Sequence, residues 1–466
     1  MTTNWRFLFF IPLILLVILF AGRYITTSPF IILALVASIV VAFITFRNPE
    51  DGILILVFSM LLSPEIAIAN VPGRAVTIRI DDLLIIVVFL AWLAHTTVDK
   101  DWKGFIKTPL DMPLLALSVI YILGTALGII AGNINPIKGL FYTLKYIEYF
   151  ILYWTTVNVI KSKEAIPRYL IAGLITSIIV TLYVYSQFGV VSRASAPFDK
   201  VGGEPASLGG YYLVVFAVLF SIVLHSESLI TILLCSGVII LTLPPFVKTL
   251  SRASYLAFGP IMLTLFVLTK RRRMVFGMFM IAGALLFPIA FNDLYTNMTA
   301  RVMATFTSRS PGQLEDVSIG SGGAKITDLS ALARMDSWKT VIQKHFPRNL
   351  KTILIGNGVT GIGFVEGQFF LILGETGILG ALFFYWILMK TAFFSYRLYR
   401  KINVTLIRSI SLATIACIIG LLFQSLTTNT FIIVRIMEPF WFLIALVMTV
   451  PDVYGVEEAL ALPASA

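Results

Sequence analysis

Long apolar segments recur along the whole chain and alternate with short polar ones. Several are shorter than the roughly 20 residues that a straight membrane span needs, and Pro64 with Glu65 and Arg435 with Glu438 interrupt the third and the last. The pattern therefore predicts an all-α, polytopic integral membrane protein with about 12–14 transmembrane helices. The apolar segments lie near residues 7–22, 29–46, 52–70, 82–98, 110–131, 139–160, 166–189, 208–226, 229–247, 252–269, 274–291, 368–394, 409–426 and 433–450.

Composition leads to the same class. Of the 466 residues, 58% are hydrophobic and 13% are charged, and a soluble domain cannot bury that much apolar surface. The first segment lacks a small-residue cleavage site, which favours an uncleaved span over a signal peptide. Cys235 and Cys417 both fall inside apolar segments. This argues against a disulfide framework and, without nearby histidines, against a zinc site.

The net charge of +11 is concentrated in short loops, which is a pattern of membrane orientation rather than nucleic-acid binding. Lys and Arg number 15 in one set of alternate loops and 9 in the other. The positive-inside rule then places both termini in the cytoplasm. The basic run Lys270–Arg273 places the next loop outside. The richer, inner loops are 47–51, 99–109, 161–168, 226–228, 270–273 and 396–408, and the outer ones are 23–28, 70–80, 132–138, 190–207, 244–252 and 426–435.

These features divide the chain into four parts: helices 1–11 at 1–291, a large outer loop at 292–367, C-terminal spans at 368–450, and a short, disordered cytoplasmic tail at 451–466. Pro311-Gly312 and the turn Gly320–Gly323 predict that part of the large loop is mobile.

The second part of that loop is predicted to be helical from Asp328, a suitable N-cap. Apolar residues recur there at helical spacing. The narrow, Trp-containing stripe predicts a helix on the membrane surface or over a cavity. The residues of the stripe are Leu332, Met335, Trp338 and Ile342.

A Gly-rich loop runs directly into an apolar helix within Gly356–Gly380. Glu366 lies at the mouth of this helix, and Glu375 lies about two turns inside it. A carboxylate inside a span is energetically unfavourable and so indicates a function or a buried partner. The sequence leaves three roles open for Glu366: a general base, a group that orients the ligand, or a solvated loop residue. Glu375 is more often structural, paired with an Arg or Lys of another helix.

Small residues along the same helix predict that a neighbouring helix approaches it closely. They are Gly374, Gly377 and Ala381, which lie three to four positions apart.

Four arginines fall in the predicted outer segments: Arg193, Arg252, Arg334 and Arg435. Guanidinium groups bind phosphate oxygens bidentately and stay charged when partly buried. Two or three of them at a membrane surface would suit a diphosphate. The simpler interpretation is that each one snorkels or contacts a phospholipid.

Other polar residues have simpler explanations. Lys145 and Glu148 are spaced to pair with each other on one helix. His345 is a candidate base, but Phe-Pro-Arg follows it and it resembles a surface residue. The chain contains no P-loop, metal-ligand cluster or nucleophile elbow, so neither a cofactor nor a metal is expected.

In the order and sidedness of its motifs, the chain resembles the O-antigen ligases and polymerases of bacterial surface polysaccharide assembly, best over about 185–385. The matching motifs, in order, are Arg193 before Glu204-Pro205, Ser251-Arg252 at the start of a span, Arg334-Met-Asp-Ser-Trp338, Gly356-Asn-Gly358, and Glu375-Thr-Gly-Ile-Leu-Gly380. One position departs from the family pattern. Ligases that attach glycan to lipid A core carry a His followed by Asn, Ser or Gln where this chain has Glu366 and Gly367. This favours a polymerase or a divergent polysaccharide ligase.

The resemblance implies a metal-independent glycosyltransferase at the periplasmic face of the bacterial inner membrane, in lipopolysaccharide-type assembly. Its donor would be an undecaprenyl-diphosphate-linked glycan, and its acceptor another lipid-linked glycan or a sugar hydroxyl. Arg193, Arg252 and Glu366 would be catalytic. The implied substrate-binding residues are Arg334, Trp338, Gln368, Glu204 and Arg435. Membrane lipids would surround it, and the resemblance allows for a co-polymerase that regulates chain length.

Two other classes compete with this interpretation. A lipid-linked oligosaccharide flippase or other transporter would explain the many spans, but it predicts inverted repeats with broken helices in matching halves. The sequence shows no such symmetry. A structural scaffold predicts charges without sidedness, whereas the selected arginines all fall on one predicted side.

Overall fold

The computed structural model describes residues 29–71, 74–99, 105–199, 204–293, 295–296, 298–300, 329–363 and 365–456. Three features predicted from the sequence lie outside these ranges. They are the first span, the turns at 311–323 and the N-cap Asp328.

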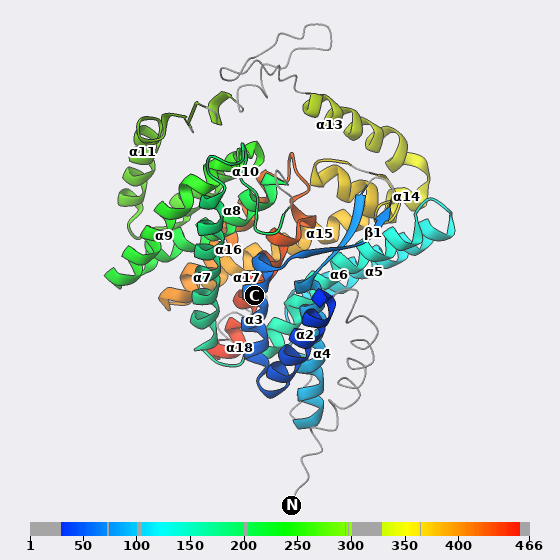
Figure 1. The fold of residues 1–466 in the computed structure, drawn as a ribbon, viewed down its shortest axis with the longest axis horizontal. Helices are drawn as coiled ribbons and strands as arrows, with labels where there is room; N and C mark the ends of the chain where they lie inside the picture. Colours follow the sequence, from blue (N-terminus) through cyan, green and yellow to red (C-terminus); the bar gives the residue numbers. More distant parts are fainter. Residues whose placement is uncertain are drawn as a thin grey trace, which may run out of the picture.

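The described chain is almost entirely helical, which confirms the predicted all-α, multi-pass membrane class (Figure 1). Within the described residues, eight helices are long and apolar enough to cross a membrane, if α17 and α18 are taken as one, and α2, α10 and α11 are shorter apolar helices. The principal helices are α2 (Pro29–Arg47), α3 (Pro49–Leu62), α4 (Ile80–Asp99), α5 (Asp111–Ile130), α6 (Pro136–Val159), α7 (Ala165–Ser186), α8 (Pro205–His225), α9 (Leu229–Lys248), α10 (Arg252–Leu268), α11 (Arg273–Ala290), α15 (Gln368–Lys401), α16 (Thr405–Gln424), α17 (Val434–Met448) and α18 (Val450–Tyr454).

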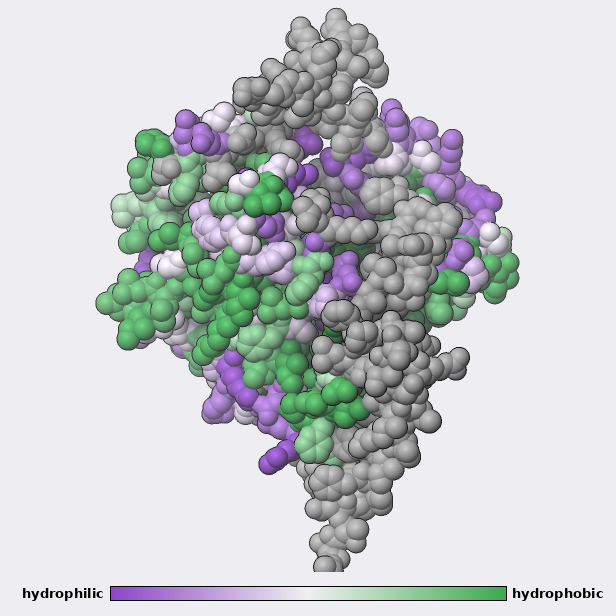
Figure 2. All heavy atoms as spheres, viewed as in Figure 1, coloured by the Kyte–Doolittle hydropathy of each residue, from purple (hydrophilic) through white to green (hydrophobic). Residues whose placement is uncertain are grey.

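Three helices form the centre of the molecule. In α8, α16 and the α17–α18 pair, 72–78% of the most apolar stretch is buried by protein, against 39% in α7 and α9. A helix that is hydrophobic on all sides belongs either in such a core or against lipid. Figure 2 shows hydrophobic side chains spread over the face that carries α9 and α11. There Leu233, Leu234 and Leu286 are about 60% exposed, as expected of a lipid-facing surface.

The third predicted span is shorter than its apolar segment. Helix α3 ends at Leu62, and two antiparallel strands follow, β1 (Glu65–Val71) and β2 (Arg74–Arg79). Pro64 explains the change, because a proline drives the preceding residue out of the helical region. Ser63 is accordingly extended, with φ −95° and ψ 126°. The prediction of a span over 52–70 is therefore wrong beyond Leu62.

The C-terminal segment also differs from the prediction. The disordered tail was expected from Pro451, but α18 continues in helical conformation to Tyr454. Pro451 falls in the first turn of α18, where a missing backbone N–H is tolerated.

Helix α15 is broken at Gly377, whose φ of 64° and ψ of −165° are accessible in practice only to glycine. The break frees the carbonyls of Gly374 and Glu375. They accept hydrogen bonds from the backbone N–H groups of Asn357 at 3.0 Å and Gly358 at 2.9 Å. Non-helical backbone at membrane depth persists where protein satisfies its polar groups.

The neighbouring helix that approaches the small residues of α15 is a short one. The segment that packs there is the short helix α14 (Leu350–Ile355) and the turn after it. A Cβ atom at Gly377 would lie 2.6 Å from the Leu354 carbonyl. The predicted close approach of a neighbouring helix is confirmed, and that helix is α14.

The contacts of the loops agree with the two groups derived from charge. Within the predicted outer group, Arg193 contacts the carbonyls of Thr249 and Leu250, and Arg435 contacts that of Pro197. Within the predicted inner group, Ser162 hydrogen-bonds to Glu50, and Arg168 pairs with Asp51.

Candidate functional site

The segments that carry the predicted site residues are joined to one another at a single region, which we call the candidate site. It comprises the loop 190–199, the first turns of α8, α10 and α17, the segment 425–433, and the start of α15 from Val365 with the helix α13 (Leu329–Thr340) that packs on it. Gln424 is one link, because its amide donates to the Ala206 carbonyl and the Ser254 hydroxyl, each at 3.0 Å. Asn429 is another, because it donates to the Val365 carbonyl.

Arg193 and Arg252 come from neighbouring segments. Arg193 Nε and Nη2 donate to the carbonyls of Thr249 at 3.4 Å and Leu250 at 3.3 Å. Arg252 begins α10 directly after Ser251, whose hydroxyl caps the helix at Ser254 N. Both arginines are partly exposed. The structure thus brings the two predicted diphosphate-binding segments together.

The loop that carries Arg193 is fixed from both sides. Gln187 holds it through paired hydrogen bonds, in which its amide donates to the Ser195 carbonyl at 2.9 Å and its carbonyl accepts from Ser195 N at 3.0 Å. Ala194 N donates to the Lys248 carbonyl at 3.0 Å. A binding group on such a loop is preorganised, which reduces the entropy lost when a ligand binds.

Glu366 lies at the mouth of α15, as predicted, and it pairs with Arg334. Arg334 belongs to α13 (Leu329–Thr340), which confirms the helix expected in the second part of the long loop. The indole of Trp338, one turn later, donates to the Glu366 carbonyl. A predicted substrate-binding residue and a predicted catalytic residue are therefore ion-paired.

Trp338 also stacks on Phe370, with ring centroids 4.7 Å apart and an interplanar angle of 15°. A sugar ring could stack only on its other face. Trp338 and Phe370 pack with Val341, Ile362, Val365 and Leu371 in a small apolar cluster, which fixes α13 against the start of α15.

Two predicted substrate-binding residues are buried. Gln368 is 1% exposed, and its carbonyl accepts a hydrogen bond from Phe431 N at 3.0 Å. Arg435 is 2% exposed and pairs with Asp199 at 2.8 Å while donating to the Pro197 carbonyl. These side chains position the segments 425–433 and 190–199, and their contact with substrate stays a prediction. Glu204 is exposed beside Pro205, the first residue of α8.

Burial raises the pKa of Asp199 from 3.8 to about 6, although the Arg435 guanidinium opposes the shift. Burial also lowers the pKa of His345, and Arg348 and Lys344 add to that effect. His345 is thus neutral near pH 7, and its backbone carbonyl accepts a hydrogen bond from Asn357.

Glu375 is buried, as predicted, but its partners differ from the expected Arg or Lys. Thr360 N donates to its carboxylate at 2.7 Å, and the Tyr146 hydroxyl hydrogen-bonds to it. Among the described residues, no ion pair to Glu375 is found. A protonated or ionised acid can accept both hydrogen bonds, so the site needs no basic residue.

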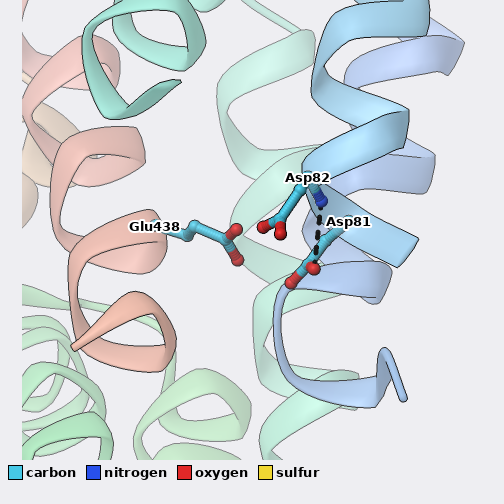
Figure 3. A group of neighbouring side chains, drawn as sticks. All are labelled: Asp81, Asp82 and Glu438. Carbon is cyan, nitrogen blue, oxygen red and sulfur yellow. Dashed lines mark hydrogen bonds between the residues drawn. The ribbon is translucent and has the colours of Figure 1, made fainter. Parts of the chain in front are cut away.

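Sequence reasoning missed that six buried or nearly buried charged residues meet at the end of the hairpin. Lys145 and Glu148 pair at 3.5 Å as predicted, but Lys145 also pairs with Asp82. Glu438 of α17 points toward Asp81 and Asp82 of α4 (Figure 3). The signal available in the sequence was an Asp-Asp pair at the start of one apolar segment and a lone Glu within another. We call Arg79, Asp81, Asp82, Lys145, Glu148 and Glu438 the buried charge cluster.

The buried charge cluster adjoins the candidate site. Glu65 lies opposite Arg79 in the hairpin and is 3.9 Å from Arg435. Arg435 and Glu438 are three residues apart on α17. A chain of charged groups therefore leads from Asp199 at the candidate site, through Arg435, to the interior.

No family model matches this chain, and no curated protein matches its sequence.

Proposed function

We propose that this protein transfers a glycan from an undecaprenyl-diphosphate-linked donor to a sugar hydroxyl at the periplasmic face of a bacterial inner membrane. The observation that supports it best is the meeting of the Arg193 and Arg252 segments, both partly exposed and held on a fixed loop and a helix start. In this proposal both termini are cytoplasmic and the segment 292–367 is periplasmic.

In the reaction, the acceptor oxygen forms a bond to the anomeric carbon, and the bond from that carbon to the diphosphate oxygen breaks. The diphosphate leaves with the electron pair, and Glu366 or solvent takes the hydroxyl proton. Arg193 and Arg252 stabilise the charge on the departing diphosphate. The fixed loop holds the donor in position relative to the acceptor.

Arg334 has a second role in this proposal. Its side chain is 24% exposed and that of Glu366 is 33% exposed, so both are accessible to a ligand. A donor phosphate that binds Arg334 would compete with Glu366 for the guanidinium. The released carboxylate would then be available to the acceptor hydroxyl.

An assay with purified protein in detergent and short lipid-diphosphate-linked glycans tests this function. A ladder of products with release of undecaprenyl diphosphate is the expected result for a polymerase, and a single transfer to an added acceptor is expected for a ligase. Absence of both products with several donors would contradict the proposal.

A transporter of lipid-linked glycans is the second candidate, and the break in α15 favours it. Transporters place broken helices and buried charges around their substrate. Movement of a fluorescent lipid-linked glycan across liposomes that contain the protein, without new glycosidic bonds, would support this alternative.

A further inference from the structure

The buried charge cluster contains more negative than positive groups. Its acids are Asp81, Asp82, Glu148 and Glu438, and its bases are Arg79 and Lys145. All are buried or nearly so; Lys145, the most accessible, is 13% exposed. With every group ionised, four acids and two bases leave a formal charge of −2, which is equal and opposite to that of one divalent cation.

The two aspartates already have basic partners. Asp81 pairs with Arg79 at 2.6 Å and accepts a hydrogen bond from Asp82 N at 3.1 Å. Asp82 pairs with Lys145 and accepts a hydrogen bond from the backbone N–H of Arg79 at 2.9 Å. Glu148 shares Lys145 with Asp82.

Glu438 differs from these acids. It is 0% exposed, and no described N–H or hydroxyl group donates to its carboxylate oxygens, which lie beside those of Asp81. A buried ionised carboxylate without donors is strongly unfavourable. Its side chain extends from α17 toward the aspartates of α4 (Figure 3).

The three carboxylates are close enough to share one ion. Each residue offers one carboxylate oxygen, and these three oxygens, from Asp81, Asp82 and Glu438, all lie within 4.8 Å of one another. Ligand oxygens lie roughly 2.0–2.6 Å from Mg²⁺ or Ca²⁺, so two of them around one ion are at most about 4–5 Å apart. An all-oxygen set suits Mg²⁺, Mn²⁺ or Ca²⁺ rather than a thiophilic metal.

We propose that Asp81, Asp82 and Glu438 bind one divalent cation of the Mg²⁺, Mn²⁺ or Ca²⁺ type beneath the candidate site. The ion satisfies the Glu438 oxygens and links α4 to α17. Because Arg435 lies one turn before Glu438 and pairs with Asp199, this link also steadies the loop 190–199. The proposal does not depend on the reaction assigned above.

Binding of Mn²⁺ to EDTA-treated, desalted protein in detergent tests the proposal directly, with free Mn²⁺ measured by electron paramagnetic resonance. We expect one bound Mn²⁺ per chain, displaced by Mg²⁺ or Ca²⁺. Glu438→Gln and Asp82→Asn should weaken this binding at least tenfold. The control Glu227→Gln removes an exposed carboxylate that pairs with Arg271, and it should bind Mn²⁺ with the affinity of the wild type.

Each variant is first checked for a single symmetric peak in size-exclusion chromatography, so that misfolding is separated from loss of the ion. Failure of the wild-type protein to bind Mn²⁺ would overturn the proposal. It would also be overturned if folded Glu438→Gln bound Mn²⁺ with wild-type affinity. In either case protons, rather than a metal ion, would neutralise the cluster.

Discussion

Arg334 and Glu366 form an ion pair although 32 positions separate them in the sequence. One residue lies on the helix α13 and the other at the mouth of α15. The pair fixes α13, in the second part of the long loop, against the start of α15, the helix that is broken at Gly377. It also brings together a predicted substrate-binding residue, Arg334, and a predicted catalytic residue, Glu366.

This pair gives a test that separates docking from chemistry. Arg334→Glu places like charges together and should lower the thermal unfolding temperature and the transfer activity. The double variant Arg334→Glu/Glu366→Arg restores opposite charges, so it should recover stability. The recovery is small, about 0.2–1 kcal/mol, because the pair is partly exposed.

Activity should remain lost in the double variant if Glu366 and Arg334 touch the substrates. Thermal unfolding and the product ladder are measured on the same preparations. Recovery of full activity by the swap would show that the pair serves only to dock α13.

Arg193→Ala or Arg252→Ala should reduce chain growth by at least about a hundredfold, because each removes positive charge from the leaving diphosphate. Membrane insertion and expression should be unchanged. The control Arg168→Ala removes an exposed arginine that pairs with Asp51 in the opposite group of loops. It should retain activity, and near-normal polymer from both site variants would refute the diphosphate clamp.

Gly377→Ala should destabilise the protein by at least about 2 kcal/mol, because its φ of 64° and ψ of −165° disfavour any side chain. The added Cβ would also meet the Leu354 carbonyl. Gly173→Ala on α7 is a matched control, since it has no atom within 4 Å and no positive φ. Equal unfolding temperatures for the two variants would contradict the described break in α15.

Asp199 predicts a pH-dependent stability. Its pKa is 3.8 when unperturbed and about 6 in the folded protein. The folded state therefore holds the proton more tightly, so the stabilisation is complete below about pH 4 and is lost as the pH rises through 6. The shift of about two pKa units corresponds to about 3 kcal/mol.

Asp199→Asn removes this titration. The unfolding temperature of the wild type should fall relative to that of Asp199→Asn between pH 4 and pH 7. A difference that is constant over this range, or that grows in favour of the wild type, would show that Asp199 is not held in the buried position beside Arg435.

The sequence determined the class of the protein because membrane spans are set by local hydropathy. A run of apolar residues must satisfy its backbone hydrogen bonds within itself, so most span positions follow from the sequence, although α3 ends at Leu62 inside a predicted span. The helix that contains Arg334 and Trp338 was equally predictable, because its apolar residues recur locally at helical spacing. Likewise, Lys145 and Glu148 are near neighbours on one helix.

Tertiary structure alone decided which charged groups meet. Whether Arg435 faces a ligand or Asp199 depends on how α17 packs against a loop more than two hundred residues earlier. The buried charge cluster joins β2, α4, α6 and α17, and hydropathy carries no information on such partners. The break in α15 is also tertiary in origin: Gly377 permits it, but the N–H groups of Asn357 and Gly358 stabilise it, and they arrive from a turn that only the folded chain brings there.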